Sequence, residues 1–541
     1  MRYLLLLLSL LILAPAAPAV YAQSAAWQDT SSRIDNLFAN WDSTTAGGVL
    51  TIQRRDSIIY NRALGMADLE HGIPNTPATV FEAGSVSKQF TAAAIFLLAM
   101  DGKLSLDDKV RKYFPELPAV NDKITIRHLI HHTSGLRDWG SVASISGWWR
   151  GTRNYTQAHV LDILTRQQAL NFPAGDQYSY CNSGYNLMAM IVAKVSGQSF
   201  AEFCQKRIFE PAGMTHSQWR DDYRKIVPNR AIAYNQQNGS YLQDMPFENA
   251  HGNGGLLTTT ADLLRWSRQY KSPIIGGDAL LRLQLQQGKL NNGATIHYAG
   301  GLSIGEVNSF REISHSGSTA GYRAWLAYYP EPDLTVAFLS NEANVNPAQI
   351  GAQVAGMLLG TRPQTAPAIN ASAPMDNALA GKAGLYHCLR NDDLIELEAK
   401  DGALRLKTGQ PLVPTTGNTF LQGDTRLEFS NNQFIAYYSN GDSATYLKKT
   451  PVKPTTNELQ AFTGTYHSSE AEVSFQLDVK DGKLRCFRRP DNYFFLTPLY
   501  QDTFRTGSGS LVRFRRDASG KITGFGYSVA RASGVWFERQ K

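Results

Sequence analysis

The stretch that decides the fold is Phe81-Glu-Ala-Gly-Ser85-Val-Ser-Lys88-Gln-Phe-Thr-Ala-Ala-Ala-Ile-Phe-Leu-Leu-Ala-Met100. Its second half is rich in Ala and Leu and almost free of charge, which predicts a buried helix over 87–100 that ends before Gly102. If this helix starts near Ser85, the backbone N–H groups around that serine lack intrahelical partners and favour an oxyanion. Lys88 lies on the same helix face, beside the Ser85 hydroxyl. Ser85 is therefore a candidate nucleophile, and Lys88 can be its base if burial and nearby cations lower the lysine pKa.

Two further stretches carry polar groups suited to such a site. Tyr180-Cys-Asn182 lies in a predicted loop, where the phenol can relay a proton and the Asn182 amide can hold a substrate amide. Each motif alone also has a simpler explanation. Ser-x-x-Lys occurs by chance, and a turn tyrosine or a capping asparagine is common.

The third stretch is Ser314-His315-Ser316-Gly317-Ser318, at the end of a predicted strand. Gly317 would let a substrate backbone lie against the strand edge, and the N–H of Ser318 would be a second oxyanion donor with that of Ser85. His315 could supply positive charge or shuttle a proton near neutral pH. A histidine without a chemical role is the alternative interpretation of this strand.

In this order the three motifs resemble the three signatures of the serine β-lactamase and penicillin-binding-protein superfamily. The stretches Ile124–Leu136 and Gly252–Leu256 look like those of its class C-related branch, and the resemblance covers about 23–360. It implies roles for these groups: Ser85 as the acylated nucleophile, Lys88 and Tyr180 in proton transfer, Asn182 and His315 as further catalytic residues, the backbone N–H groups of Ser85 and Ser318 as oxyanion donors, and Asn182 and Gly317 in substrate binding.

One departure bears on the substrate. β-Lactamases and carboxypeptidases of the superfamily mostly have Lys-Thr-Gly or Lys-Ser-Gly as the third signature, whereas this chain has His315-Ser316-Gly317. His-x-Gly is typical of D-aminopeptidases and of some esterases in this branch. A neutral imidazole holds a substrate carboxylate less well than an ammonium group does, so penicillinase or D-Ala carboxypeptidase activity is not expected.

The rest of the chain suggests three domains. Hairpin patterns at 48–63 and 322–339 enclose a long helical middle, which predicts an α/β (α+β) domain whose antiparallel sheet is flanked by helices. In the tail, Gly384-Leu-Tyr-His recurs as Gly464-Thr-Tyr-His, and Lys400-Asp-Gly recurs as Lys480-Asp-Gly, which predicts two tandem all-β, barrel-like units. The expected order is a signal peptide (1–22), the hydrolase domain (23–362), a linker (363–377) and the two β units (378–451 and 457–541).

This three-domain order resembles that of the D-aminopeptidases with C-terminal lipocalin-like β domains, in which a barrel loop can reach the active-site cleft. Residues 488–494 could form such a loop here, although ordinary barrel surface is the simpler interpretation. The four cysteines show no metal or redox spacing; Cys388 and Cys486 could pair, but small buried residues are the favoured interpretation.

Composition narrows the remaining classes. With 541 residues, 43% hydrophobic and 18% charged, the chain is neither disordered nor collagen-like, and a net charge of +7 without a dense basic block does not indicate nucleic-acid binding. The apolar run near the N-terminus is too short to span a membrane, so we expect a secreted or periplasmic protein without stable membrane insertion. His128, His131 and His132 have helical metal-ligand spacing, but no accompanying Glu supports a metal site.

Together these observations predict a serine hydrolase that cleaves amide bonds of short peptides through an acyl-Ser85 intermediate. Peptides that contain D-residues, non-ribosomal peptides and linearised cyclic peptides are the expected substrates, with no cofactor and no metal. A carboxylesterase or transesterase of the same superfamily is one alternative, and a non-catalytic penicillin- or ligand-binding protein is another. The oligomeric state stays open.

Overall fold

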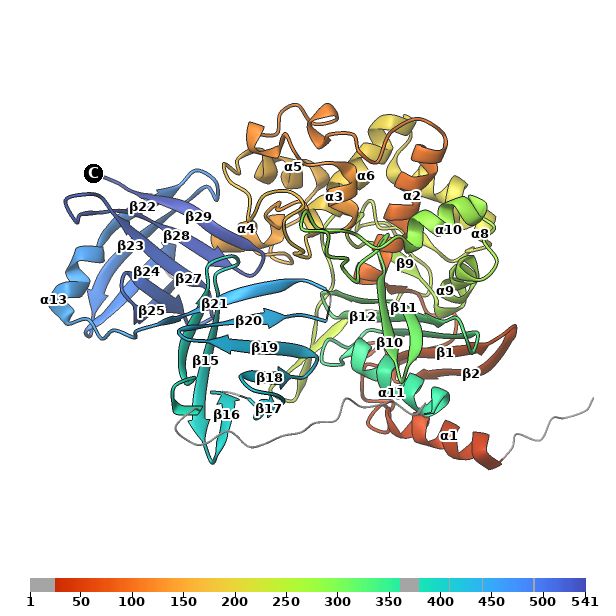
Figure 1. Cartoon of the computed structure of the whole chain (residues 1–541). Helices are drawn as coiled ribbons and strands as arrows, with labels where there is room; N and C mark the ends of the chain where they lie inside the picture. Colours follow the sequence, from red (N-terminus) through yellow and green to blue (C-terminus); the bar gives the residue numbers. More distant parts are fainter. Residues whose placement is uncertain (1–24, 361–378, 408, 440, 490–491) are drawn as a thin grey trace, which may run out of the picture. The chain divides into compact units, whose positions relative to one another are not determined.

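The computed structural model describes residues 25–360, 379–407, 409–439, 441–489 and 492–541 (Figure 1). The predicted signal peptide (1–22) and linker (363–377) lie outside these residues. The chain divides into a short N-terminal unit that ends at Ala39 and contains α1 (Ala25–Asn36), and a second unit, Asn40–Lys541, that holds everything described below.

The first large domain is built on a six-stranded antiparallel sheet, as the hairpin patterns predicted. The first strands of the domain pair with its last strand, since Gly48 of β1 lies opposite Ser340 of β13. The strand order is β10 (Ser303–Val307), β11 (Phe310–Thr319), β12 (Tyr322–Tyr329), β13 (Leu334–Ser340), β1 (Gly48–Arg54) and β2 (Ser57–Leu64). Short strands outside this sheet are β3 (Met66–Asp68), β4 (Ile73–Pro74), β5 (Phe81–Glu82), β6 (Gln218–Trp219), β7 (Tyr234–Gln237), β8 (Ser240–Gln243) and β9 (Leu256–Thr258).

Helices cover both faces of the sheet (Figure 1). On one face, α11 (Pro347–Leu359) lies so close that a Cβ on Gly351 would overlap the Trp325 ring of β12. On the other, Thr260 of α9 (Thr260–Ser267) hydrogen-bonds Thr51 of β1. The other helices of the domain are α2 (Lys88–Met100), α3 (Ile126–Ile130), α4 (Trp139–Ile145), α5 (Gln157–Thr165), α6 (Asn182–Ser196), α7 (Phe200–Cys204), α8 (Glu210–Ala212) and α10 (Gly277–Leu285).

The expected buried helix is α2, and every residue of it from Lys88 to Leu98 is buried. A short 3₁₀ helix, η1 (Gly84–Ser87), precedes it and runs directly into it. The serine and the lysine of the first motif therefore lie on one continuous turn, with Ser85 partly exposed and Lys88 fully buried.

Both tail repeats fold as all-β units. The first is an open sheet of eight strands: β14 (Gly384–Cys388), β15 (Asp393–Lys400), β16 (Ala403–Leu406), β17 (Val413–Pro414), β18 (Thr419–Gln422), β19 (Thr425–Ser430), β20 (Gln433–Tyr437) and β21 (Ser443–Lys449). After α13 (Thr456–Leu459), the second closes into a barrel: β22 (Gly464–Ser468), β23 (Val473–Lys480), β24 (Lys483–Arg489), β25 (Asn492–Tyr500), β26 (Thr503–Thr506), β27 (Leu511–Arg516), β28 (Ile522–Val529) and β29 (Ala532–Arg539).

The repeated Lys-Asp-Gly sequence explains one shared feature of the two units. It forms the turn of the β15–β16 hairpin and of the β23–β24 hairpin, and Asp401, Gly402, Asp481 and Gly482 all have positive φ. Asp-Gly is a preferred pair for such two-residue turns. The same local sequence therefore sets the same hairpin twice.

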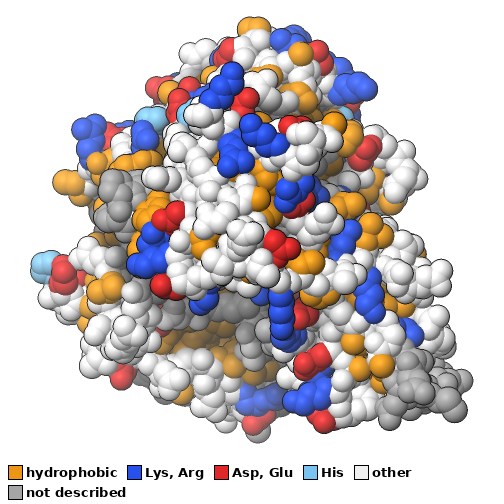
Figure 2. Space-filling view, turned by 90° about the vertical axis from the view of Figure 1, so that its left-hand side faces the viewer, with side chains coloured by type: hydrophobic (Ala, Val, Ile, Leu, Met, Phe, Trp, Pro, Cys, Tyr) orange, Lys and Arg blue, Asp and Glu red, His pale blue; other side chains and the backbone are white. Residues whose placement is uncertain are grey.

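Three features of the whole chain complete the description. Cys181, Cys204, Cys388 and Cys486 are all buried and free, so Cys388 and Cys486 do not pair. No helix in the described part of the chain has both the length and the apolar character needed to cross a bilayer. On the face drawn in Figure 2, basic and acidic side chains are interspersed rather than gathered in one basic patch.

Candidate active site

Two glycines bring the Ser85 turn against strand β11. Gly84 has a φ of +49°, and a Cβ on it would lie 2.6 Å from the backbone nitrogen of Ser318. A Cβ on Gly317 would lie 2.1 Å from the carbonyl oxygen of Ala83. Gly317 is therefore needed for packing between η1 and β11, and its expected contact with a substrate backbone stays a prediction. The close approach places the backbones of Ser85 and Ser318, the expected oxyanion donors, side by side.

Lys88 has the environment of an uncharged amine. Its side chain is 0% exposed, and burial, helped by the positive charges of Arg531 and Arg150, holds its pKa well below the ordinary value. Its Nζ lies 3.0 Å from Oδ1 of Asn182 and 2.6 Å from the carbonyl oxygen of Asn253. In the uncharged form of the amine, these two accepting oxygens take its two N–H groups.

The remaining contact of Nζ is the Ser85 hydroxyl, 3.1 Å away. With both N–H groups engaged, the nitrogen lone pair is the part of the amine left for this contact. The arrangement therefore suits transfer of the Ser85 proton to Lys88. Asn253, whose carbonyl orients the amine, lies in the Gly252–Leu256 stretch, but no role was predicted for it.

Tyr180 offers a proton next to this pair. Its hydroxyl is buried and makes no hydrogen bond within the described residues, and its ring centroid lies 4.8 Å from Lys88 Nζ. Burial raises the pKa of Tyr180, although the nearby Ser85 hydroxyl acts in the opposite direction. The phenol therefore stays protonated at neutral pH and can donate a proton to a group that enters the cavity.

Asn182 begins helix α6 and connects two parts of the site. Its side-chain oxygen accepts from Lys88, and its backbone N–H donates to Asp138 Oδ2 at 2.9 Å. Asp138 caps helix α4 by accepting from the N–H groups of Gly140 and Ser141. Asn182 therefore orients the lysine, in addition to the substrate contact that the sequence suggested.

His315 is held as a neutral ring. Its Nδ1 lies 2.6 Å from the carbonyl oxygen of Ser316, which only accepts, so the Nδ1 proton is donated there. Its Nε2 lies 3.0 Å from the Tyr298 hydroxyl and accepts from it. Burial is the main cause that lowers the pKa of His315, to about 3. The expected positive charge or proton shuttle at His315 is therefore not supported, because both nitrogens are engaged in the neutral form.

These side chains open into one cavity of about 340 Å³. Two of the residues that line it, Arg150 and Arg531, were not predicted from the sequence. Arg150 pairs with the buried carboxylate of Glu248. The full lining comprises Gly84, Ser85, Arg150, Tyr180, Asn182, Asn253, Gly254, His315, Ser316, Ser318, Thr319 and Arg531.

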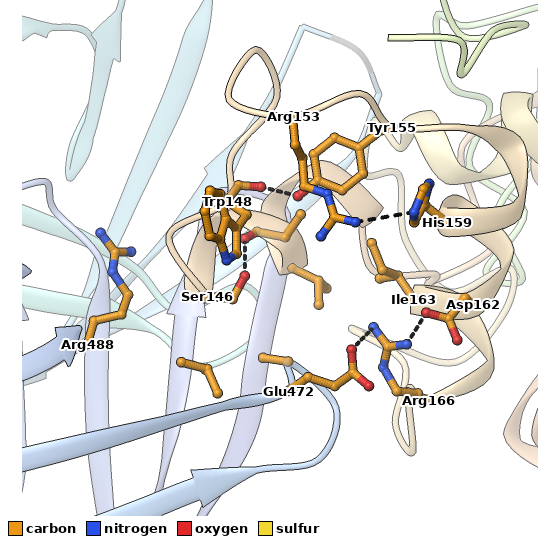
Figure 3. Close-up of a pocket in the computed structure, with 14 residues that line it drawn as sticks. Ser146, Trp148, Arg153, Tyr155, His159, Asp162, Ile163, Arg166, Glu472 and Arg488 are labelled. Carbon is orange, nitrogen blue, oxygen red and sulfur yellow. Dashed lines mark hydrogen bonds and ion pairs between the residues drawn. The ribbon is translucent and has the colours of Figure 1, made fainter. Parts of the chain in front are cut away.

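Arg531 comes from the C-terminal barrel, which packs on the catalytic domain around α4 and α5. A buried ion pair joins Arg137 to Glu470 at 2.6 Å, and Arg166 pairs with Glu472 at 3.2 Å. Figure 3 shows the second pair at one end of a pocket between the two domains. The barrel therefore contributes directly to the wall of the Ser85 cavity.

The predicted barrel loop, 488–494, does not supply that wall. Arg488 donates to the carbonyl oxygen of Ser144 in α4 at 2.9 Å, residues 490–491 lie outside the described part, and none of the described residues of 488–494 lines the Ser85 cavity. The barrel residue that does line it is Arg531, in the β28–β29 turn.

The three histidines with metal-ligand spacing have separate contacts. His128 forms a capping box with Thr125 at the start of α3, and His131 Nε2 contacts the carbonyl oxygen of Gln286. His132 Nδ1 accepts from the backbone N–H of Cys181. Of the three, His132 holds the Tyr180 loop, whereas His128 and His131 contact other segments.

Comparison with known proteins shows what the chain is similar to. The profile of the beta-lactamase family matches residues 34–357. Penicillin-binding protein 4* of Bacillus subtilis is 31% identical over 317 residues, which cover 55% of this chain and 68% of that protein. The D-aminopeptidase of Brucella canis is 24% identical over 519 residues, 91% of this chain and 95% of the relative. The structure of a D-amino acid amidase from Ochrobactrum anthropi SV3 aligns with a TM-score of 0.52 at 20% identity, covering 62% of this chain and 97% of that one.

Proposed function

The chain belongs to the beta-lactamase family and is a serine hydrolase, and we propose that it cleaves amide bonds of short peptides through an acyl-Ser85 intermediate. One observation carries the proposal: the buried amine of Lys88, whose pKa is held well below its ordinary value, lies 3.1 Å from the hydroxyl of Ser85, which lines an open cavity. The similarity to a D-aminopeptidase over 91% of the chain supports peptides that contain D-residues as substrates.

In the proposed acylation step, Lys88 Nζ takes the Ser85 proton while Oγ attacks the carbonyl carbon of the scissile amide. The backbone N–H groups of Ser85 and Ser318 stabilise the developing oxyanion. As the tetrahedral intermediate collapses, the C–N bond breaks and Tyr180 gives its proton to the leaving amine. Lys88 returns a proton to Tyr180 and is neutral again.

Deacylation repeats these steps with water. Lys88 takes a proton from a water molecule while the water oxygen attacks the acyl carbon. Ser85 Oγ then leaves and receives that proton from Lys88. The enzyme returns to its starting state with the carboxylic acid released. Because the same base serves both halves, loss of Lys88 should slow acylation and deacylation together.

A fluorophosphonate probe tests the nucleophile. The full-length protein should be labelled once, and the Ser85→Ala variant should not be labelled. Ser146→Ala, which changes a serine outside the Ser85 cavity, is the control and should be labelled like the wild type. Labelling that persists in Ser85→Ala would refute the assignment. Incubation with a peptide library of L- and D-residues, with free and blocked ends, then identifies the cleaved bond by mass spectrometry.

We also propose that the protein is secreted or periplasmic, supported by the cationic start, the short apolar run and the small residues before position 23. N-terminal sequencing of the mature protein from the extracytoplasmic fraction should begin at Gln23. A mature chain that retains Met1 would contradict this proposal.

A further inference from the structure

Arg531 is fixed in the catalytic cavity by its main chain. It forms the two-residue turn between β28 and β29 with Ala530. Its carbonyl oxygen accepts from the backbone N–H of Asp138 at 3.0 Å and from the side chain of Asn171 at 3.1 Å, and its N–H donates to Ser141 Oγ at 3.3 Å. Because these anchors use backbone atoms of Arg531, the position of this residue does not depend on its side chain.

The guanidinium group is held along one edge and open along the other. Its Nε lies 3.5 Å from Asp138 Oδ2, and its central carbon lies 5.5 Å from the centroid of the Tyr180 ring. The side chain is nevertheless 43% exposed, and no hydrogen bond to a described residue engages its two terminal nitrogens. The Asp138 carboxylate is meanwhile shared among three backbone N–H groups, those of Gly140, Ser141 and Asn182.

The charges around the cavity favour an anion. Its lining contains Arg150 and Arg531 but no aspartate or glutamate of the described chain. Arg150 is paired with both carboxylate oxygens of Glu248, and His315 is neutral. The two free nitrogens of Arg531 form the planar fork that matches a carboxylate. An ammonium group at this position would instead meet a cation.

We propose that Arg531 is a specificity-determining residue that binds a carboxylate of the substrate beside the scissile amide bond. The inference rests on the proposed function for the identity of that bond. It narrows the substrate to peptides or N-acyl amino acids that carry a free carboxylate near the cleavage site, either at the main-chain end or on an acidic side chain. The residue that binds the substrate carboxylate then belongs to the barrel. The third motif of this chain has His315 where other members of the superfamily mostly have a lysine.

Equilibrium binding tests this assignment without turnover. Calorimetry on full-length Ser85→Ala would compare N-acetyl-D-alanine with N-acetyl-D-alaninamide, which probes a main-chain carboxylate. A second pair, N-acetyl-D-glutamic acid α-amide and N-acetyl-D-glutaminamide, probes a side-chain carboxylate. We expect at least one acid to bind about 10- to 100-fold more tightly than its neutral partner, as a charge-assisted bidentate contact gives.

The variants are made in the Ser85→Ala background. Arg531→Gln keeps the backbone anchors and should bring the acid-to-amide ratio close to one, whereas Arg531→Lys keeps a cation and should retain part of the preference. Arg515→Gln is the matched control, because Arg515 stacks on Trp536 on the barrel surface away from the cavity. Its ratio should equal that of Ser85→Ala alone.

Three results would overturn the inference: a ratio near one for both pairs in Ser85→Ala, a preference that survives Arg531→Gln, or a preference that falls as far in Arg531→Lys as in Arg531→Gln. A different measurement, fluorophosphonate labelling, tests the proposed function. A wild-type protein that fluorophosphonate does not label would refute the serine chemistry, whereas the binding ratio alone decides the role of Arg531.

Discussion

Replacement of Lys88 by methionine separates proton transfer from packing. Methionine has a similar length and keeps the buried volume, but it has no nitrogen to accept the Ser85 proton. General-base catalysis contributes about 10²- to 10⁴-fold, which corresponds to roughly 3–5 kcal/mol of transition-state stabilisation. We therefore expect kcat/KM for a cleaved peptide to fall by that factor, with kcat reduced more than KM is changed.

The effect on stability has two opposing parts. Asn182 Oδ1 and the Asn253 carbonyl lose their donor, at a cost of about 1–3 kcal/mol for each buried acceptor. Against this, the folded state no longer has to hold an uncharged lysine. Lys88 is protonated below about pH 10.5 in the unfolded chain, whereas burial lowers its pKa in the folded chain. Between these two pKa values folding releases a proton, so the free energy of unfolding of the wild type rises with pH.

Measuring stability as a function of pH separates these two opposing effects. Thermal unfolding of wild type and Lys88→Met between pH 7 and pH 10 should show a wild type that gains stability relative to the variant as the pH increases. Lys194→Met is the control, because Lys194 is exposed on α6 and donates to the carbonyl oxygen of Tyr113. Its activity should be unchanged. A loss of activity below tenfold in Lys88→Met, or a difference in stability that does not vary with pH, would refute the reasoning.

Three further substitutions test other parts of the site. Tyr180→Phe should lower kcat about 10²- to 10³-fold without lowering the melting temperature, since the hydroxyl has no partner among the described residues; a stability loss above about 1 kcal/mol would argue for a structural role. Gly317→Ala should displace η1 and lose most activity, because its Cβ would lie 2.1 Å from the Ala83 carbonyl oxygen. Gly305→Ala on β10 is the control, because its Cβ meets nothing within 4 Å, and it should leave the melting temperature and the rate unchanged. His315→Gln should make the protein less sensitive to acid, because the wild-type ring has a pKa of about 3 when folded and about 6.5 when unfolded. From pH 7 to pH 5 the free energy of unfolding of the wild type, measured by denaturant titration, should fall by about 2 kcal/mol more than that of the variant. Equal losses would show a ring that protonates normally.

The sequence was most informative where chemistry depends on local spacing. The separation of Ser85 and Lys88 places both on one face once the segment is helical, and the Lys-Asp-Gly turns specify the same hairpin in both β units. The pairing of β1 with β13 followed from hairpin patterns at both ends of the domain. These features are set by residues close together in the chain or by patterns that recur.

The sequence was least informative where a property depends on distant neighbours. The neutrality of His315 arises from the Tyr298 hydroxyl, the Ser316 carbonyl and burial, none of which the motif itself reveals. The packing role of Gly317 was not predictable, because its partner, Ala83, is far away in sequence. Arg531 lies in a turn with no motif, and only the docking of the barrel on α4 brings it beside Ser85.

The main-chain anchoring of the β28–β29 turn makes position 531 exchangeable. Since Asp138, Ser141 and Asn171 hold backbone atoms, any L-amino acid except proline, which lacks the N–H donated to Ser141, can be presented to the cavity from the same fixed support. Selectivity can therefore diversify in the barrel while the nucleophile and its base stay unchanged. A saturation library at this single codon should yield enzymes with different substrate preferences and similar melting temperatures.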